Sequence, residues 1–396
     1  MRKNLHWILI GLAIVIRILL SASTYHSDLG AFASAGKYIA GEGKWLTFYD
    51  EIASKDETGK MVVHRQDVVF NYQPLAYLIP SFFYLPFSSL IKQTGELFMN
   101  RDWVTSQNVP FIPLLSLYKL PMILADLAML WLLPRFFVKQ KNKKLAQLLW
   151  AFNPVAIFVS SIMGQVDMVI TLFLTLSLYF FKNKKSLLAI VFISLSALIK
   201  PIGLILIPLI LIPSFQNKKY FQTIGLGLVG VGTYLLGILP FIGSASYRYY
   251  ALFAEQINKS TYAGISIASG HDVPFFFIVY VYILFLFWSK KISLWTAFGT
   301  AILSSLAFTH FHPQWLVWLT PWLIIYSIEK KNYLFYIATL LCWFGVLFSF
   351  DESLHLQTFL QSKLIIPPAI RASNFFKEII QISRAGLIAT LFRYLR

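Results

Sequence analysis

Several side chains that could bind or transform a substrate stand at the ends of apolar segments rather than inside hydrophilic stretches. His26 and Asp28 follow the first apolar run, and Gln165 and Asp167 interrupt SIMGQVDMVITLF. The remaining ones are Lys200 in ALIKPIG, Arg248 in SYRYY, His271 and Asp272 in SGHDVP, and His310, His312 and Gln314 in THFHPQW. Ionisable side chains at membrane depth are costly and usually functional. These residues are therefore the candidates for a site.

The residue types in this set suit the transfer of a group from a phosphate. A carboxylate close to an acceptor hydroxyl can work as a general base. Lysine, arginine and histidine side chains can neutralise the charge on a phosphate leaving group. The combination predicts group transfer from a lipid-linked phosphate whose tail lies between helices.

The elements that position these residues are membrane helices. The chain has 396 residues, of which 57% are hydrophobic and 13% are charged, and its mean hydropathy is +0.66. A soluble domain has about 25% charged residues, so lipid must be part of the solvent. About twelve apolar runs predict an all-α, polytopic fold: 6–24, 113–134, 145–162, 167–181, 186–199, 201–214, 220–242, 273–289, 292–309, 314–328, 332–350 and 374–392.

The segment 72–91 is apolar enough to span a membrane, but three prolines interrupt it at a spacing of six residues. Each proline removes a helix hydrogen bond. If 72–91 spanned, the lysine-rich loops 139–144 and 182–185 would lie outside, against the positive-inside rule. We therefore predict interfacial helices within a long first outer loop, 25–112.

This topology places both termini and the basic loops in the cytoplasm and all the candidate side chains at the outer interface. The formal charge of +17 then reflects topology signals, and nucleic acid is not expected as a partner. Cys342 is the sole cysteine, so no disulfide can form within the chain. No internal repeat is visible, and residues 1–396 are predicted to form one transmembrane domain. A bacterial plasma membrane is favoured, because no eukaryotic retention signal is found.

An ordered series of motifs runs along the whole chain: HSDLGAF, NYQPLAYL, KLPMILADLAML, WAFNPVAIFVSSIMGQVDMVITLF, LSALIKPIGLILIPL and HPQWLVWLTPWL. This series resembles the membrane-embedded GT-C glycosyltransferases that use polyprenyl-phosphate sugars as donors. It is similar in particular to bacterial mannosyltransferase-like relatives of the second mannosyltransferase of glycosylphosphatidylinositol assembly. It also resembles the glucosyltransferases of lipid-linked oligosaccharide assembly.

The resemblance implies transfer of a hexose, mannose or glucose, from a polyprenyl-phosphate donor to an outer-face lipid, glycan or protein. It implies that Asp28 is the catalytic base, that Gln165, Asp167 and Lys200 line the cavity, and that the segment around His312 approaches the donor phosphate. The first loop lacks a clear Asp-x-Asp pair. Transfer without a divalent metal or other cofactor is therefore expected.

Other interpretations stay open from the sequence. Asp28 could be a solvated loop acid, Asp167 could cap the following helix, and Lys200 could extend its ammonium to the interface. Arg17 and Asp126 lie within spans and predict a buried structural pair. A secondary transporter is an alternative function, although transporters place polar residues near the midplane in paired repeats. A polysaccharide polymerase or ligase and a lipid flippase are further alternatives.

Overall fold

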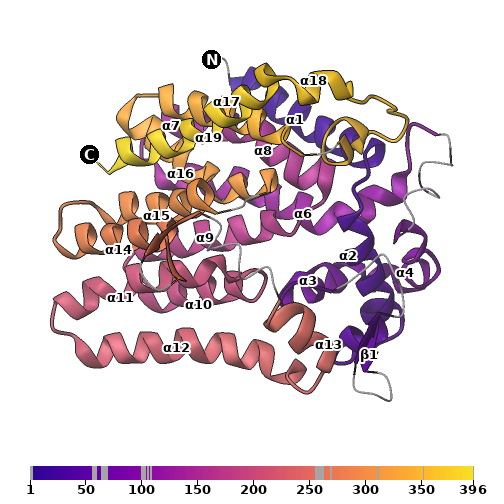
Figure 1. Cartoon of the computed structure of the whole chain (residues 1–396), viewed down its shortest axis with the longest axis horizontal. Helices are drawn as coiled ribbons and strands as arrows, with labels where there is room; N and C mark the ends of the chain where they lie inside the picture. The colour runs from indigo at the N-terminus through magenta and orange to yellow at the C-terminus, as the bar shows by residue number, and fades with distance from the viewer. Residues whose placement is uncertain are drawn as a thin grey trace.

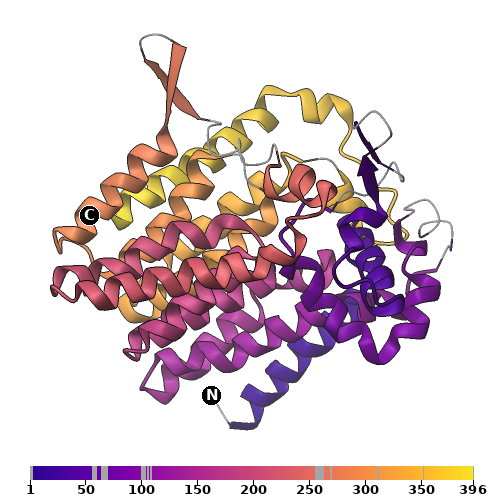
Figure 2. The ribbon, with the colours of Figure 1, turned by 90° about the horizontal axis from the view of Figure 1, so that it is seen from below.

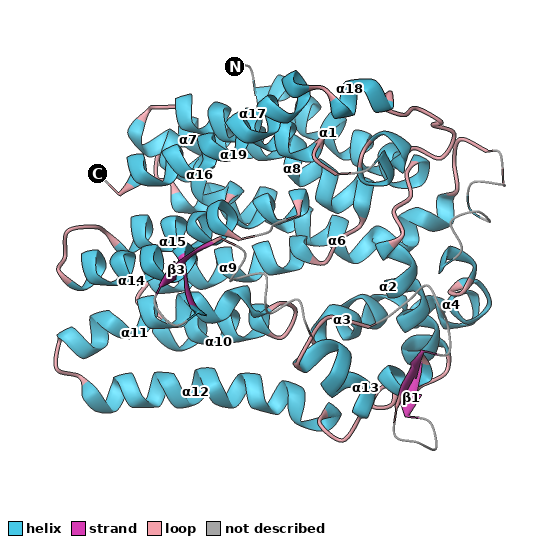
Figure 3. Ribbon diagram, viewed as in Figure 1, coloured by secondary structure: helices cyan, strands magenta, loops and turns pink. Residues whose placement is uncertain are grey.

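The structure is a computed structural model that describes residues 3–55, 60–63, 70–99, 104, 107, 109–254, 263–267, 270–309, 312–350 and 352–395. Helices make up most of it (Figure 3). The longer helices are α1 (Lys3–Ser23), α6 (Pro113–Leu132), α7 (Gln140–Ala151), α9 (Asp167–Lys182), α10 (Ser186–Ala197), α11 (Ile207–Gln216), α12 (Tyr220–Ile238), α14 (Phe275–Trp288), α15 (Leu294–Phe308), α16 (Thr320–Lys330), α17 (Leu334–Leu347) and α19 (Asn374–Tyr394).

Shorter elements connect these helices. They are α2 (Asp28–Gly36), α3 (Leu75–Tyr84), α4 (Ser88–Thr94), α8 (Pro154–Ile157), α13 (Ala245–Tyr247) and α18 (Pro368–Ala372), with the π-helices η1 (Lys37–Gly41), η6 (Phe158–Met163) and η9 (Arg248–Leu252). The 3-10 helices are η2 (Phe48–Glu51), η3 (Leu85–Phe87), η4 (Leu97–Met99), η5 (Leu133–Phe136), η7 (Pro201–Leu206), η8 (Leu239–Phe241), η12 (Pro313–Trp318), η13 (Glu352–Leu354) and η14 (Leu356–Thr358). The strands pair as β1 (Ala53–Lys55) with β2 (Met61–Val63), and β3 (Gly264–Ile267) with β4 (His271–Pro274).

The long helices lie side by side in a bundle whose two ends differ (Figures 1 and 2). The end that carries α2, α3, α4, β1 and α13, here called the loop end, is on the right in both views. The turns between α11 and α12 and between α14 and α15 lie at the opposite end, on the left. Helices satisfy every interior backbone group within one segment, which is what an apolar solvent demands.

The predicted apolar runs coincide with helices, but the number of spans is not settled by helix length. Four helical segments are long and apolar enough to cross a membrane, at 4–23, 75–94, 113–136 and 220–241, among the described residues. A bent pair, 140–151 with 154–163, is a fifth candidate, and five apolar helices are shorter. The structure thus supports a helical membrane protein, and the count of twelve stays a prediction.

Two features differ from the predicted helices. The run 145–162 was expected to be one span, but it bends by 48° at Asn153, where Pro154 starts a new helix and the Asn153 side chain accepts the Ala156 N–H. Proline is favoured at the first helical position after an asparagine cap. Two short β-hairpins, β1–β2 and β3–β4, add a little strand to a fold predicted to be all-α.

The segment 72–91 forms α3, η3 and α4, as expected for helices in the first loop. Pro74 caps α3 at its N-terminus, Pro80 lies inside it and Pro86 lies in η3. Phe82 and Phe87 are exposed on one side, whereas Tyr84 is buried against the bundle. An apolar face open to the surroundings fits a helix at the membrane interface, and the interfacial placement stays a prediction.

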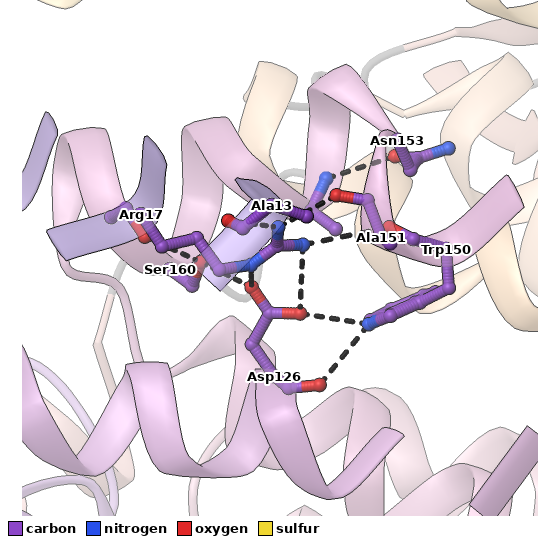
Figure 4. A network of polar contacts seen from close by, with 9 residues as sticks. Ala13, Arg17, Asp126, Trp150, Ala151, Asn153 and Ser160 are labelled. Carbon is purple, nitrogen blue, oxygen red and sulfur yellow. Dashed lines mark hydrogen bonds and ion pairs between the residues drawn. The ribbon is translucent and has the colours of Figure 1, made fainter. Parts of the chain in front are cut away.

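A buried ion pair joins the first helix to the middle of the bundle, as the sequence predicted (Figure 4). Arg17 of α1 donates from Nε to Asp126 Oδ2 of α6 at 2.7 Å, and neither side chain is exposed to solvent. The guanidinium also donates to the Ala151 carbonyl at 2.6 Å. Asp126 accepts further hydrogen bonds from Trp150 Nε1 at 2.7 Å and Ser160 Oγ at 2.6 Å. One pair therefore connects α1, α6, α7 and η6.

Four helices end on lysines in the left-handed conformation. Lys184, Lys218, Lys290 and Lys331 have φ between 52° and 60°, where glycine is the usual residue. In the first of these turns the Lys184 N–H donates to the Phe181 carbonyl at 2.9 Å. The positive charges also oppose the negative ends of the helix dipoles. These turns join α9 to α10, α11 to α12, α14 to α15 and α16 to α17.

The ion pair generates a stability prediction. Arg17→Met leaves the Asp126 charge buried without its cation, and breaking such a pair costs about 3–5 kcal/mol. Arg17→Met/Asp126→Asn removes that charge and is expected to recover part of the loss. Thermal unfolding of both purified variants in detergent checks this, and a double variant less stable than the single one would contradict it.

Candidate functional site

The Asp28 carboxylate lies at the start of α2, at the loop end of the bundle. Asp28 is the first residue of α2. Gln165 donates from Nε2 to Asp28 Oδ2 at 2.6 Å. The Asp28 side chain keeps 38% of its surface exposed, so the carboxylate can be reached from outside the bundle.

The His26 side chain contacts the backbone of Asp28. The Asp28 N–H donates to His26 Nδ1 at 3.2 Å. His26 Nδ1 also lies 3.8 Å from Asp28 Oδ2. The ring is almost fully buried and holds the first turn of α2 in place.

Gln165 and Asp167 are presented by a sharp turn between η6 and α9. Gly164 ends η6 with φ 71°, a conformation that glycine adopts without steric cost. The Gln165 N–H then donates back to the Val159 carbonyl at 2.9 Å. Asp167 follows as the first residue of α9, and Val166 holds the N-cap position before it. Asp167 was expected as the cap; it lies one position later, in the first turn of α9.

Lys200 is the partner of Asp167. Its Nζ lies 2.7 Å from Asp167 Oδ2, and the side chains are 8% and 0% exposed. The alternative that Lys200 extends to water is therefore wrong. Lys200 is in extended backbone because a residue before proline avoids the helical region. The Leu75 N–H donates to the Leu198 carbonyl at 3.0 Å, which attaches the start of α3 beside this lysine.

Aromatic rings enclose the lysine on two sides. Lys200 Nζ lies 4.6 Å from the centre of the Tyr72 ring and 5.8 Å from that of Trp315. The His312 ring lies 5.4 Å from the Trp315 ring, which brings the HPQW segment to the site. Burial raises the pKa of the Tyr72 hydroxyl well above its ordinary value, and the charges of Asp28 and Asp167 add to this. The hydroxyl therefore keeps its proton at physiological pH.

Three buried oxygen atoms in these segments have no hydrogen-bond partner within the described part of the chain. They are Gln165 Oε1, Asp167 Oδ1 and Gln314 Oε1. All three are acceptors, and a buried acceptor without a donor is costly. The site can therefore receive a ligand rich in hydroxyl groups.

The other predicted residues lie elsewhere or outside the described residues. Arg248 donates to the carbonyls of Ile242 and Gly243, so it holds a turn at the loop end. His271 and Asp272 lie in the exposed β4, and Asp272 accepts from Ser266 at 2.5 Å. The β3–β4 hairpin projects from the body, away from α2, in Figure 2. His310 lies outside the described residues, and the roles of all four stay predictions.

No role was predicted for Tyr72 or Trp315, although both lie in the quoted motifs. Aromatic residues are frequent in this chain, so no local signal separated these two from packing residues. Among the described residues, no group of three His, Cys, Asp or Glu side chains could hold a metal ion. Independence from metal stays a prediction.

Comparison with known proteins relates the chain to a solved structure. No protein-family model matches it, and no curated protein matches it in sequence. The structure is similar to the crystal structure of ArnT from Cupriavidus metallidurans bound to undecaprenyl phosphate. The TM-score is 0.52 at 12% identity, and the match covers 100% of this chain and 75% of ArnT. The two chains thus share a fold.

The Gly164 turn generates a second prediction. A Cβ at this position would lie 2.6 Å from Lys119 Cγ and 3.1 Å from Leu29 Cδ1, and the left-handed conformation costs a non-glycine residue roughly 1–2 kcal/mol. We expect Gly164→Ala to lower the melting temperature in detergent. Gly225→Ala is the matched control, because nothing lies within 4 Å of a Cβ there and alanine favours a helix. Equal melting temperatures for the two variants would contradict the prediction.

Proposed function

We propose that this protein is a membrane glycosyltransferase that moves a hexose from a polyprenyl-phosphate donor to an acceptor hydroxyl. One observation carries the proposal. An exposed carboxylate, Asp28, is oriented by Gln165 at 2.6 Å, and the buried Asp167–Lys200 pair lies in the same site. Such an arrangement provides a base that the acceptor can reach beside a cation suited to phosphate.

The reaction balances with these groups alone. The acceptor oxygen attacks C1 of the donor sugar while its proton passes to Asp28. The bond between C1 and the phosphate oxygen breaks, and the electron pair leaves with the polyprenyl phosphate. Gln165 holds Asp28 Oδ2, so the second carboxylate oxygen is free to face the acceptor. Lys200 stabilises the charge that develops on the leaving phosphate.

The sugar would be held by the acceptor atoms that lack partners. Gln165 Oε1 and Asp167 Oδ1 are buried and unpaired in the described structure. Hydroxyl groups of a hexose are donors that would satisfy both oxygens. The Tyr72 and Trp315 rings beside Lys200 supply the flat apolar faces against which a sugar ring packs.

The polyprenyl tail would lie on the apolar side of the same segment. Trp318 stacks on Trp315, with ring centres 5.3 Å apart. Trp318 also lines an apolar pocket between α9, α15, η12 and α16, together with Leu174, Leu178, Phe298, Ile302 and Trp322. This pocket is far smaller than a polyprenyl chain, so it shows only that the surroundings of the Trp315–Trp318 pair are apolar.

The ArnT structure supports the same class of donor. ArnT shares the fold and was solved with undecaprenyl phosphate, which is the polyprenyl-phosphate part of the donor proposed here. The ordered motifs of the sequence support membership of the GT-C superfamily. Mannose or glucose as the sugar, and an outer-face lipid, glycan or protein as the acceptor, are further parts of the proposal.

We also propose that the loop end faces away from the cytoplasm of a bacterial cell, with both termini inside. The four left-handed lysine turns lie on connections opposite to those that present Asp28 and Lys200. Basic residues concentrate in cytoplasmic loops, and these lysines occupy positions where glycine would be less strained. The positive charge of these four lysine turns therefore supports an orientation with the loop end away from the cytoplasm.

The catalytic assignment predicts the effect of one substitution. Asp28→Asn removes the base but keeps the size of the side chain, and we expect the transfer rate to fall about 10²–10⁴-fold. Purified protein in nanodiscs is given polyprenyl-phosphate mannose or glucose carrying a radiolabel, together with a lipid extract from the source membrane. Release of labelled product is measured.

Asp50→Asn is the matched control for this experiment. Asp50 belongs to the same loop, is exposed, and accepts a hydrogen bond from Ser244 at 2.6 Å. This control should transfer sugar at the wild-type rate. If Asp28→Asn transfers sugar at the wild-type rate, Asp28 is not the base. If the wild-type protein consumes neither polyprenyl-phosphate mannose nor polyprenyl-phosphate glucose, the proposed function is overturned.

Independence from metal is tested with the same assay. The leaving phosphate is assigned to Lys200, so we expect EDTA to leave the transfer rate unchanged within about twofold. A loss of activity that Mg²⁺ or Mn²⁺ restores would show that a divalent cation takes part in the reaction.

A further inference from the structure

Lys119 lies in the middle of α6 in an unusual environment. Its ammonium nitrogen lies 3.1 Å from the Ser21 carbonyl oxygen, 2.6 Å from that of Thr24, 3.0 Å from that of Ser161 and 2.9 Å from that of Ile162. Thr24 Oγ1 is a fifth acceptor at 2.9 Å. The side chain is fully buried, and none of the described hydrogen bonds or ion pairs of Lys119 involves a carboxylate.

The ends of two helices supply the charge that a carboxylate would otherwise provide. Ser21 and Thr24 are at the C-terminus of α1, and Ser161 and Ile162 are in the last turn of η6. Carbonyls at a helix C-terminus lack partners within the helix and carry the negative end of the dipole. Five acceptors thus face the Lys119 nitrogen, and its N–H groups donate to them.

Both helix ends lead directly into the proposed site. Thr24 precedes Asp28 by four residues, and Ile162 precedes Gln165 by three. The stem of Lys119 also supports the turn before Gln165, since its Cγ lies 2.6 Å from where a Cβ of Gly164 would be. The lysine therefore fixes the two backbone segments whose side chains form the Asp28–Gln165 hydrogen bond.

We infer that Lys119 is a positioning residue, which sets the distance between Asp28 and Gln165 by holding the ends of α1 and η6 together. The inference rests on the proposed function of that site. Lys119 is not placed to bind phosphate itself, because its three N–H groups are directed at protein oxygens. It also differs from Arg17, which joins the same helices through Asp126 but is a full helical turn or more further from the site.

The sequence carried a signal for this residue. A lysine in LYKLPMILADLAML stands within a predicted span, where an ionisable side chain is costly. The sequence could not show its partners, because they are backbone carbonyls of two other segments. Every residue carries such a carbonyl, whatever its side chain.

The test compares wild-type protein, Lys119→Met and Lys182→Met in nanodiscs. Lys182 is the matched control, because its ammonium donates to a single backbone carbonyl, that of Phe136, at 2.9 Å and away from the site. Methionine keeps an unbranched stem but removes the ammonium. Small displacements of a catalytic group can cost about 10²-fold in rate. We therefore expect Lys119→Met to lower kcat at least tenfold for each folded molecule, with the KM for the polyprenyl-phosphate sugar nearly unchanged.

Hydrogen–deuterium exchange supplies a readout that does not need activity. Peptides covering 20–30 and 159–168 should exchange faster in Lys119→Met, whereas Lys182→Met should keep wild-type exchange there and wild-type kcat. Wild-type exchange at both peptides, or wild-type kcat in Lys119→Met, would overturn the inference. If the wild-type protein transfers no sugar, the proposed function fails, and the exchange comparison still decides whether Lys119 holds the two segments.

A milder variant covers the case in which Lys119→Met does not fold. Thr24→Ala removes one of the five acceptors, Oγ1, and leaves the four carbonyls in place. We expect kcat to fall about three- to tenfold, with faster exchange confined to the same two peptides. A variant with wild-type kcat and wild-type exchange would contradict the positioning role.

Discussion

Charged side chains inside this apolar bundle are stable because groups from other helices enclose each of them. Removing an ion from water costs several kcal/mol, and only close partners offset that cost. Arg17 meets Asp126, Lys200 meets Asp167, and Lys119 meets carbonyls of two helix ends. Each of these contacts joins segments far apart in the sequence, so the buried charges also determine how the helices are arranged.

The Arg17–Asp126 pair, the Asp167–Lys200 pair and Asp28 form a graded series toward the loop end. Arg17–Asp126 is fully satisfied and enclosed, with neither side chain exposed, which suits a structural connection. Asp167–Lys200 is buried but leaves one carboxylate oxygen without a partner in the described structure. Asp28 retains exposed surface. Along this series the side chains make fewer hydrogen bonds within the protein and become more exposed. A site for a polar ligand requires both properties, because a fully paired group has no hydrogen bond left for a substrate.

The local pattern of the sequence was enough for the helices and for part of the site. Apolar runs predicted the long helices, and residue type at the ends of these runs selected Asp28, Gln165, Asp167 and Lys200. The bend at Asn153 and the two hairpins were not predicted. The bend follows from a local asparagine cap and the proline after it, a signal that hydropathy alone does not register. Arg248 and His271 were expected at the site on residue type alone. In the structure Arg248 donates hydrogen bonds to carbonyls of its own turn.

By itself the sequence determined a helical membrane protein, and it identified Asp28, Gln165, Asp167 and Lys200 as candidates for the site. Hydropathy and charge are properties of single residues summed over a short window, so they can be read directly. Only the tertiary structure decided that Gln165 bonds Asp28, that Lys200 pairs with Asp167, and that Lys119 lies beneath both segments. These contacts join residues between 33 and 137 positions apart, and three-dimensional packing alone brings such residues within hydrogen-bonding distance.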